Sequence, residues 1–146
     1  MFRVVLDANQ FVSAILSPDG PPAKALNAWR EGLFELVTSP CIINEIRKVL
    51  NYPRLSKIHK KSPKEIDLFI EDLEVLAFVA PEKLSLSVVA DDPTDDKYLV
   101  AAIEGDARFI VTGDSDLLKI REYEGVKIVT AREFLKELEV IKRRKK

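Results

Sequence analysis

Four acidic side chains stand where separate apolar segments begin or end. Asp7 follows the apolar run 2–6, Asp114 follows the run 109–111, and Glu45 and Asp96 lie in the first two turns of amphipathic segments. Brought together, such carboxylates raise one another's pKa through like-charge repulsion, so a cluster of them calls for a cation. Oxygen ligands without histidine or cysteine beside them suit Mg²⁺ or Mn²⁺ rather than zinc. The pattern therefore favours a divalent metal site.

Each of these acids also has a purely structural interpretation. Asp7 would make an Asx-turn after a strand, and Asp114 would cap a short helix. Asp96 and Asp116 stand in first helical turns, where the helix dipole favours carboxylates whatever the function. Glu45 would be a solvated surface residue. Convergence of the acids at one place is what favours the functional interpretation, and convergence depends on the fold.

Short apolar stretches alternate with amphipathic ones along the chain. This alternation predicts an α/β fold, a three-layer α/β/α sandwich with a central, mostly parallel sheet. We expect strands at residues 2–6, 33–37, 84–89, 109–111 and 126–129, with a loop at 91–94. We expect helices at residues 11–16, 23–31, 40–50, 63–76, 95–104, 117–120 and 130–141. Functional residues of such sheets lie outside the carboxyl ends of the strands, which is where this assignment places the acids.

Composition limits the classes of protein that the chain can belong to. Its 146 residues are 47% hydrophobic and 32% charged, which predicts one globular domain over residues 1–141. No apolar run is long enough to span a membrane, and a single cysteine fits a reducing compartment, so we expect a cytoplasmic protein. The net charge is −1, but residues 142–146 are all basic, and we expect them to form a disordered tail.

Four segments in order resemble the PIN-domain nucleases, and more narrowly the VapC-like toxins of toxin–antitoxin pairs. They are residues 6–9 (LDAN), 44–46 (NEI), 92–99 (DPTDDKYL) and 112–118 (TGDSDLL). One such segment alone would be a weak indication, whereas four at the predicted strand and helix ends are a specific signal. The resemblance covers nearly the whole chain and leaves out only the basic tail.

The resemblance implies a metal-dependent endoribonuclease that hydrolyses RNA phosphodiester bonds with one or two Mg²⁺ or Mn²⁺ ions. The family's four acids fall on Asp7, Glu45, Asp96 and Asp114. Two assignments stay open, because Asp95 is an alternative to Asp96, and Asp116 shares or replaces the role of Asp114. Asn9 and Ser115 would orient the ligands or metal-bound water. Where this chain has Ala8, the family often has a hydroxyl residue, so one supporting hydrogen bond is in doubt.

A basic stretch and an expected set of partners complete the prediction. Arg47, Lys48, Arg54 and Lys57 could guide an RNA backbone, although a solvated helical face explains them nearly as well. His59, in the same stretch, is not expected to take part in catalysis. The resemblance implies an RNA substrate, a small antitoxin partner and a homodimer with contacts from residues 23–31 and 63–78.

Two other classes of function compete with a nuclease. A phosphotransferase of the haloacid-dehalogenase kind would carry a second aspartate two residues after the first, where this chain has Asn9. A response-regulator receiver would carry an acidic pair that is absent before the end of the first strand. A catalytically silent PIN-fold module that binds a protein or RNA is the remaining alternative, and the presence of all four acids argues against it.

Overall fold

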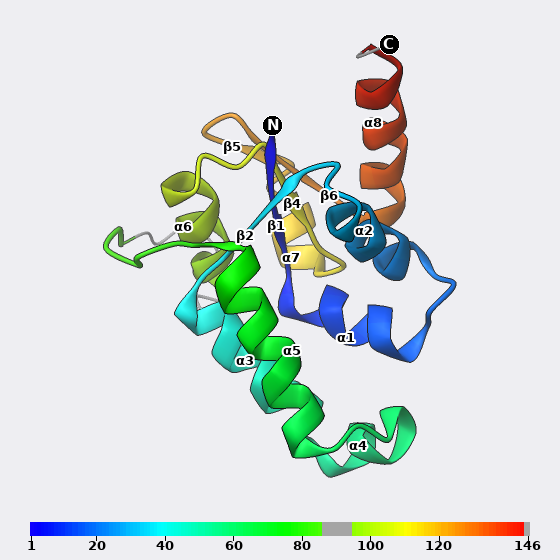
Figure 1. Cartoon of the computed structure of the whole chain (residues 1–146). Helices are drawn as coiled ribbons and strands as arrows, with labels where there is room; N and C mark the ends of the chain where they lie inside the picture. The colour runs from blue at the N-terminus through cyan, green and yellow to red at the C-terminus, as the bar shows by residue number, and fades with distance from the viewer. Residues whose placement is uncertain (86–94, 145–146) are drawn as a thin grey trace.

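A six-stranded sheet forms the middle layer of the computed structural model, which describes residues 1–85 and 95–144 (Figure 1). The strand order is β3-β2-β1-β4-β6-β5, and every neighbouring pair is parallel except β5 with β6. The strands are β1 (Arg3–Leu6), β2 (Glu35–Thr38), β3 (Phe78–Val79), β4 (Phe109–Val111), β5 (Glu122–Tyr123) and β6 (Val126–Val129).

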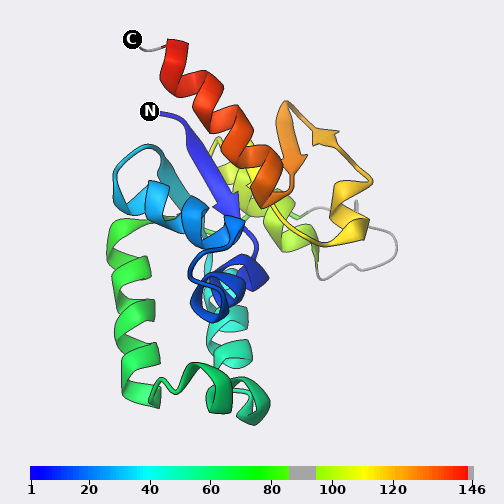
Figure 2. The same ribbon diagram turned by 90° about the vertical axis from the view of Figure 1, so that its right-hand side faces the viewer.

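Helices cover both faces of this sheet, which confirms the predicted three-layer α/β/α arrangement. Helices α2 and α8 pack together on one side and α6 lies on the other, while α1, α3, α4 and α5 gather below the sheet in the view of Figure 1 (see also Figure 2). The helices are α1 (Ala8–Leu16), α2 (Pro21–Arg30), α3 (Pro40–Leu50), α4 (Pro53–His59), α5 (Pro63–Leu76), α6 (Asp96–Glu104), α7 (Ser115–Leu118) and α8 (Ala131–Arg144).

The central strands are buried on both faces, as expected for a covered parallel sheet. Val4, Val5 and Leu6 of β1 are at most 2% exposed, and all three residues of β4 are fully buried. Four rings from different parts of the chain pack together in the core, one pair stacked and three pairs edge-to-face, with centroids 5.3–6.0 Å apart: Phe2, Phe34, Phe109 and Phe134. This core fixes β1 beside β4, and therefore fixes the two strand ends that carry Asp7 and Asp114.

Serine–proline pairs begin α3 and α5, two helices that were predicted. Ser39 caps α3 by accepting a hydrogen bond from the Ile42 amide. Ser62 and Glu65 form a reciprocal capping box at the start of α5. Proline at the first helical position lacks an N–H that would have no partner there in any case.

Several elements of the described chain differ from the prediction. The prediction of a strand at 84–89 is wrong for residues 84 and 85, which are not in a strand; the strand that follows α5 is β3. The rest of that segment and the predicted loop at 91–94 lie outside the described residues. Helix α4 was not among the expected helices, and Pro53 occupies its first turn, where proline is tolerated. Strand β5 was also not expected, and it joins β6 through a two-residue turn, Glu124-Gly125, in which both residues have positive φ.

The last helix is longer than predicted. Helix α8 continues to Arg144, so the expectation of disorder from Lys142 onward is wrong for three of those five residues. Basic side chains in the last turn of a helix interact favourably with its dipole, which accounts for the extension. No helix in the described ranges is long and apolar enough to cross a membrane.

Candidate functional site

Asp7 lies at the carboxyl end of β1, next to the end of β4. Leu6 pairs with Val111 in the sheet, which brings Asp7 beside Thr112. The Thr112 hydroxyl donates to Asp7 Oδ2 at 2.6 Å, and the Asn9 amide donates to Asp7 Oδ1 at 2.8 Å. Asp7 is thus both the cap of α1, as its structural interpretation required, and a carboxylate at the carboxyl edge of the sheet.

The surroundings of Asp7 oppose its negative charge. The residue is 3% exposed, and burial raises the pKa of its carboxyl group; the nearby Glu45 carboxylate raises that pKa further. Hydrogen bonds from Thr112 and Asn9 lower the pKa but do not cancel the effect of burial. A buried carboxylate with a like charge beside it is a good position for a bound cation.

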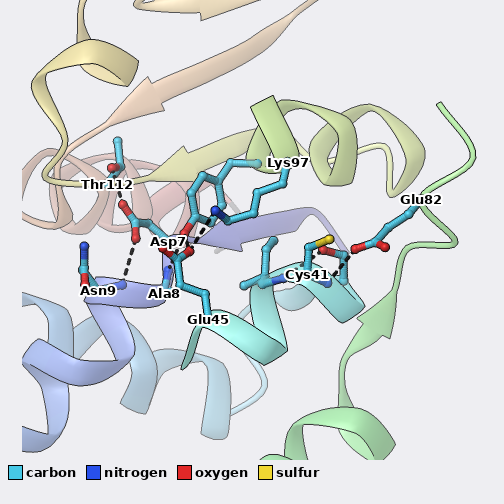
Figure 3. Close-up of polar contacts among 11 residues, drawn as sticks. Asp7, Ala8, Asn9, Cys41, Glu45, Glu82, Lys97 and Thr112 are labelled. Carbon is cyan, nitrogen blue, oxygen red and sulfur yellow. Dashed lines mark hydrogen bonds and ion pairs between the residues drawn. The ribbon is translucent and has the colours of Figure 1, made fainter. Parts of the chain in front are cut away.

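Glu45 reaches this place from the second turn of α3. Lys97 Nζ lies 3.0 Å from Glu45 Oε2, and the Tyr98 hydroxyl donates to the same oxygen at 2.5 Å. Figure 3 shows the side chains of Asp7, Glu45 and Lys97 pointing toward one another from β1, α3 and α6. Two of the four predicted acids, Asp7 and Glu45, are therefore brought together.

Tyr98 is a residue of this site that the sequence analysis missed. It is 2% exposed, and its hydroxyl also accepts a hydrogen bond from the Ala8 amide at 3.3 Å. Burial, together with the Asp7 and Glu45 charges, raises the pKa of the phenol far above its ordinary value. The sequence offered one indication of this role: Tyr98 is a tyrosine next to the apolar residues of α6, within the segment 92–99 that resembles the PIN-domain nucleases.

Asp95 and Asp96 stand at the start of α6, close in sequence to Tyr98. Asp95 is the N-cap of the helix and Asp96 its first residue, and both are 7% exposed. Burial therefore does not distinguish between them, and the choice of Asp96 over Asp95 stays a prediction.

Asp114 follows β4 and belongs to the same edge of the sheet. Its amide donates to the Thr112 hydroxyl at 3.0 Å, the hydroxyl that in turn donates to Asp7. Its side chain caps α7 by accepting from the Asp116 amide at 2.8 Å, as its structural interpretation required. Asp116 is half-buried and lies 3.7 Å from Lys119 Nζ. The choice between Asp114 and Asp116 as ligand also stays open.

The remaining candidate residues lie on the surface or in structural contacts. Asn9 and Ser115 are exposed. Of the basic candidates, Lys48, Arg54 and Lys57 are exposed, whereas Arg47 Nε lies 3.7 Å from Asp67. Figures 1 and 2 show α4, which carries Arg54 and Lys57, at the end of α3 and α5 that is remote from the sheet.

His59 has a structural explanation for both of its ring nitrogens. Nδ1 accepts a hydrogen bond from the Lys61 amide at 2.9 Å, which leaves Nε2 to donate to the Leu50 carbonyl at 2.8 Å. These contacts tie the end of α4 to the end of α3. They agree with the expectation that His59 has no part in catalysis.

The donor set fits a hard divalent cation, although the carboxylates are not gathered around one point. Within residues 1–85 and 95–144, no three histidine, cysteine, aspartate or glutamate side chains are grouped so that they could hold one metal ion. The structure does bring Asp7 and Glu45 together, and two carboxylates with like charge suit Mg²⁺ or Mn²⁺. The four-carboxylate site stays a prediction.

Known proteins are similar to this chain in sequence and in fold. Uncharacterized protein MJ1680 of Methanocaldococcus jannaschii is 30% identical over 145 residues, which cover 94% of this chain and 92% of that protein. A chain in the crystal structure of VapBC2 from Rickettsia felis, bound to a DNA fragment from their promoter, is similar with a TM-score of 0.56. That match covers 87% of this chain and 97% of the other at 14% identity, so it bears on the fold.

A family model described as a PIN domain matches residues 3–116. This stretch begins in β1 and ends in α7, so it includes both members of the Asp7–Glu45 pair and every other acid considered above. It spans most of the 146 residues. The chain therefore belongs to the PIN-domain family.

Proposed function

We propose that this protein is a metal-dependent endoribonuclease that hydrolyses RNA phosphodiester bonds. The observation that carries the proposal is the pairing of buried Asp7 with Glu45 at the carboxyl edge of the sheet. PIN domains are generally nucleases, which supports the reaction class. We assign Asp7, Glu45, Asp96 and Asp114 as ligands of one or two Mg²⁺ or Mn²⁺ ions, with Asp116 as an additional ligand.

The residues of the chain would orient these ligands. A bound Mg²⁺ or Mn²⁺ would supply an activated water and neutralise charge on the scissile phosphate. Thr112 and the Asn9 amide hold the two oxygens of Asp7, so this carboxylate has a fixed direction. Lys97 and Tyr98 both contact a single oxygen of Glu45, Oε2. We assign no covalent nucleophile.

The test is cleavage of a structured RNA by the Asp7→Asn variant and by the EDTA-treated protein. Loss of one ligand should slow cleavage by roughly a hundredfold or more, because the metal contributes several kcal/mol to the transition state. EDTA should abolish cleavage, and added Mn²⁺ should restore it. Asp72→Asn is the matched control, since Asp72 is exposed on α5 and its variant should cleave at the wild-type rate.

Cleavage that survives both EDTA and Asp7→Asn would overturn the nuclease assignment. RNA binding without cleavage by the wild-type protein would instead favour the catalytically silent module. The two outcomes are separated by measuring binding and cleavage on the same labelled RNA.

We further propose that the nuclease acts as the toxin of a toxin–antitoxin pair and forms a homodimer. The likeness of its fold to a chain of the VapBC2 structure supports a small antitoxin as partner. The test is to co-express the protein with the product of an adjacent small reading frame. Co-purification and loss of RNA cleavage in the complex are the expected results, and free cleavage in its presence would contradict the toxin assignment.

A further inference from the structure

The Tyr98 hydroxyl joins three elements at the point where the two paired carboxylates meet. Tyr98 itself belongs to α6, its hydroxyl donates to Glu45 on α3 at 2.5 Å, and it accepts from the Ala8 amide in the first turn of α1 at 3.3 Å. Ala8 directly follows Asp7 in the chain. One phenol oxygen therefore links the backbone next to the first acid with the side chain of the second.

We propose that Tyr98 is a positioning residue that sets the direction of Glu45 relative to Asp7 and so prepares the pair for a divalent cation. This inference rests on the proposed function, and it adds to the site a residue that is not one of the acids. The tyrosine is well suited to this role because its ring is buried in the core, so the hydroxyl has little freedom to move.

Lys97 contacts the same oxygen of Glu45 but differs from Tyr98 in charge. Its ammonium group lies 3.0 Å from Glu45 Oε2 and 5.0 Å from the centroid of the Tyr98 ring. A positive charge next to Glu45 opposes the approach of another cation. The Tyr98 hydroxyl is neutral, so it can orient Glu45 without repelling a metal cation. Tyr98 therefore positions Glu45, whereas Lys97 compensates its charge.

The proposal is tested by measuring Mn²⁺ affinity calorimetrically in the full chain. Tyr98→Phe keeps the buried ring and removes only the hydroxyl, and it should weaken Mn²⁺ binding by about tenfold or more, as removal of groups that orient metal ligands does. Tyr52→Phe is the matched control, because Tyr52 is 42% exposed at the start of α4 and its variant should bind like the wild type.

A double-mutant cycle distinguishes positioning from a general structural role. In a Glu45→Gln background, Tyr98→Phe should reduce Mn²⁺ affinity less than it does in the wild type, because the hydroxyl then no longer orients Glu45 and only its hydrogen bond to Asp7 remains. An equal reduction in both backgrounds, or a wild-type affinity in Tyr98→Phe, would overturn the proposal. Thermal unfolding of each metal-free variant verifies that the compared proteins are folded.

The same titrations separate this inference from the proposed function. If the wild-type protein binds no Mn²⁺, the metal-dependent nuclease fails and the positioning role fails with it. If the wild type binds Mn²⁺ and the Asp7→Asn variant does not, while Tyr98→Phe binds normally, the metal site stands and only the role of Tyr98 is overturned.

Discussion

Asp7 has two roles at the residue scale, and they have opposite consequences for stability. As the cap of α1 it satisfies the Asn9 amide, which favours the fold. As a buried carboxylate beside Glu45 it has a raised pKa, which means that its charged form is disfavoured in the folded state. A position that is strained in this way without a cation is typical of a functional site.

The first prediction follows from the sign of this pKa shift. The pKa of Asp7 is higher in the folded state than in the unfolded state, so the folded protein holds this proton more tightly. Protonation of Asp7 therefore stabilises the fold fully below the unfolded pKa of about 3.8, and this stabilisation is lost as the pH rises through the folded pKa. Asp7→Asn should therefore raise the thermal midpoint at pH 7 in EDTA, and the gain should shrink as the pH falls to 3.8 and below. Scanning calorimetry across this range is the measurement. A variant less stable than wild type at pH 7 would contradict the prediction.

The placement of Asp7 and Asp114 at one edge of the sheet could be predicted from the sequence, but the groups that contact Asp7 and Glu45 could not. Asp7 and Asp114 follow apolar runs that read as strands, and the rule for parallel sheets then places both at one edge. The contacts of Thr112 with Asp7, and of Lys97 and Tyr98 with Glu45, depend on the rotation of α6 and on side-chain directions. These are set by packing between distant segments, which sequence spacing does not specify.

At the element scale, Gly105 allows α6 to end directly against β2. A β-carbon at Gly105 would lie 2.6 Å from Val37 Cγ1 and 3.1 Å from the Ala101 carbonyl oxygen. Its φ of −91° is accessible to any residue, so the glycine is needed for close approach and not for backbone conformation. This close approach sets the position of the helix that delivers Tyr98 to the site.

We therefore expect Gly105→Ala to reduce the free energy of unfolding by about 1–3 kcal/mol, because Val37 is buried and its branched side chain has no room to move. Chemical denaturation measures this change. Gly113→Ala is the control, since the nearest atom to its added β-carbon would be Gln10 Nε2 at 3.8 Å. Equal effects of the two substitutions would show that the close approach to Val37 does not matter.

The elements that the sequence analysis did not find share a physical cause. Helix α4 has no buried residue, and β3 and β5 are two residues long, so none of them has a hydrophobic period that can be recognised. Strand β3 exists because its backbone pairs with β2, a long-range interaction. Helices α3 and α5 were predicted because cap residues and apolar residues mark them locally, and β4 was predicted because it is an apolar run.

At the scale of the whole molecule, charge is nearly balanced but unevenly placed. The chain has 23 basic and 24 acidic residues, yet α4 carries exposed Arg54 and Lys57 and no acidic side chain. An RNA that reaches the acidic edge of the sheet would be attracted by such a basic segment. Because α4 lies away from the sheet, an RNA that contacts both would have to span the distance between them (Figure 2).

Reversing both charges in an Arg54→Glu, Lys57→Glu variant should weaken RNA binding. The slope of log affinity against log salt should become shallower by roughly 0.7 for each phosphate that the protein no longer neutralises. Filter binding of a single-stranded RNA at several salt concentrations measures the slope. The control carries the same reversals at Arg132 and Lys136, which are exposed on α8. Similar slopes for both variants would argue against RNA binding by α4.

The two ends of the sheet affect how the protein behaves in a crowded solution. The outer strands β3 and β5 each contribute only two residues, so each edge offers few unpaired backbone groups. Long, flat outer strands are templates on which other chains add and aggregate. Short outer strands limit such aggregation, so the sheet can leave the edge that carries Asp7 open to solvent without offering long outer strands to other chains.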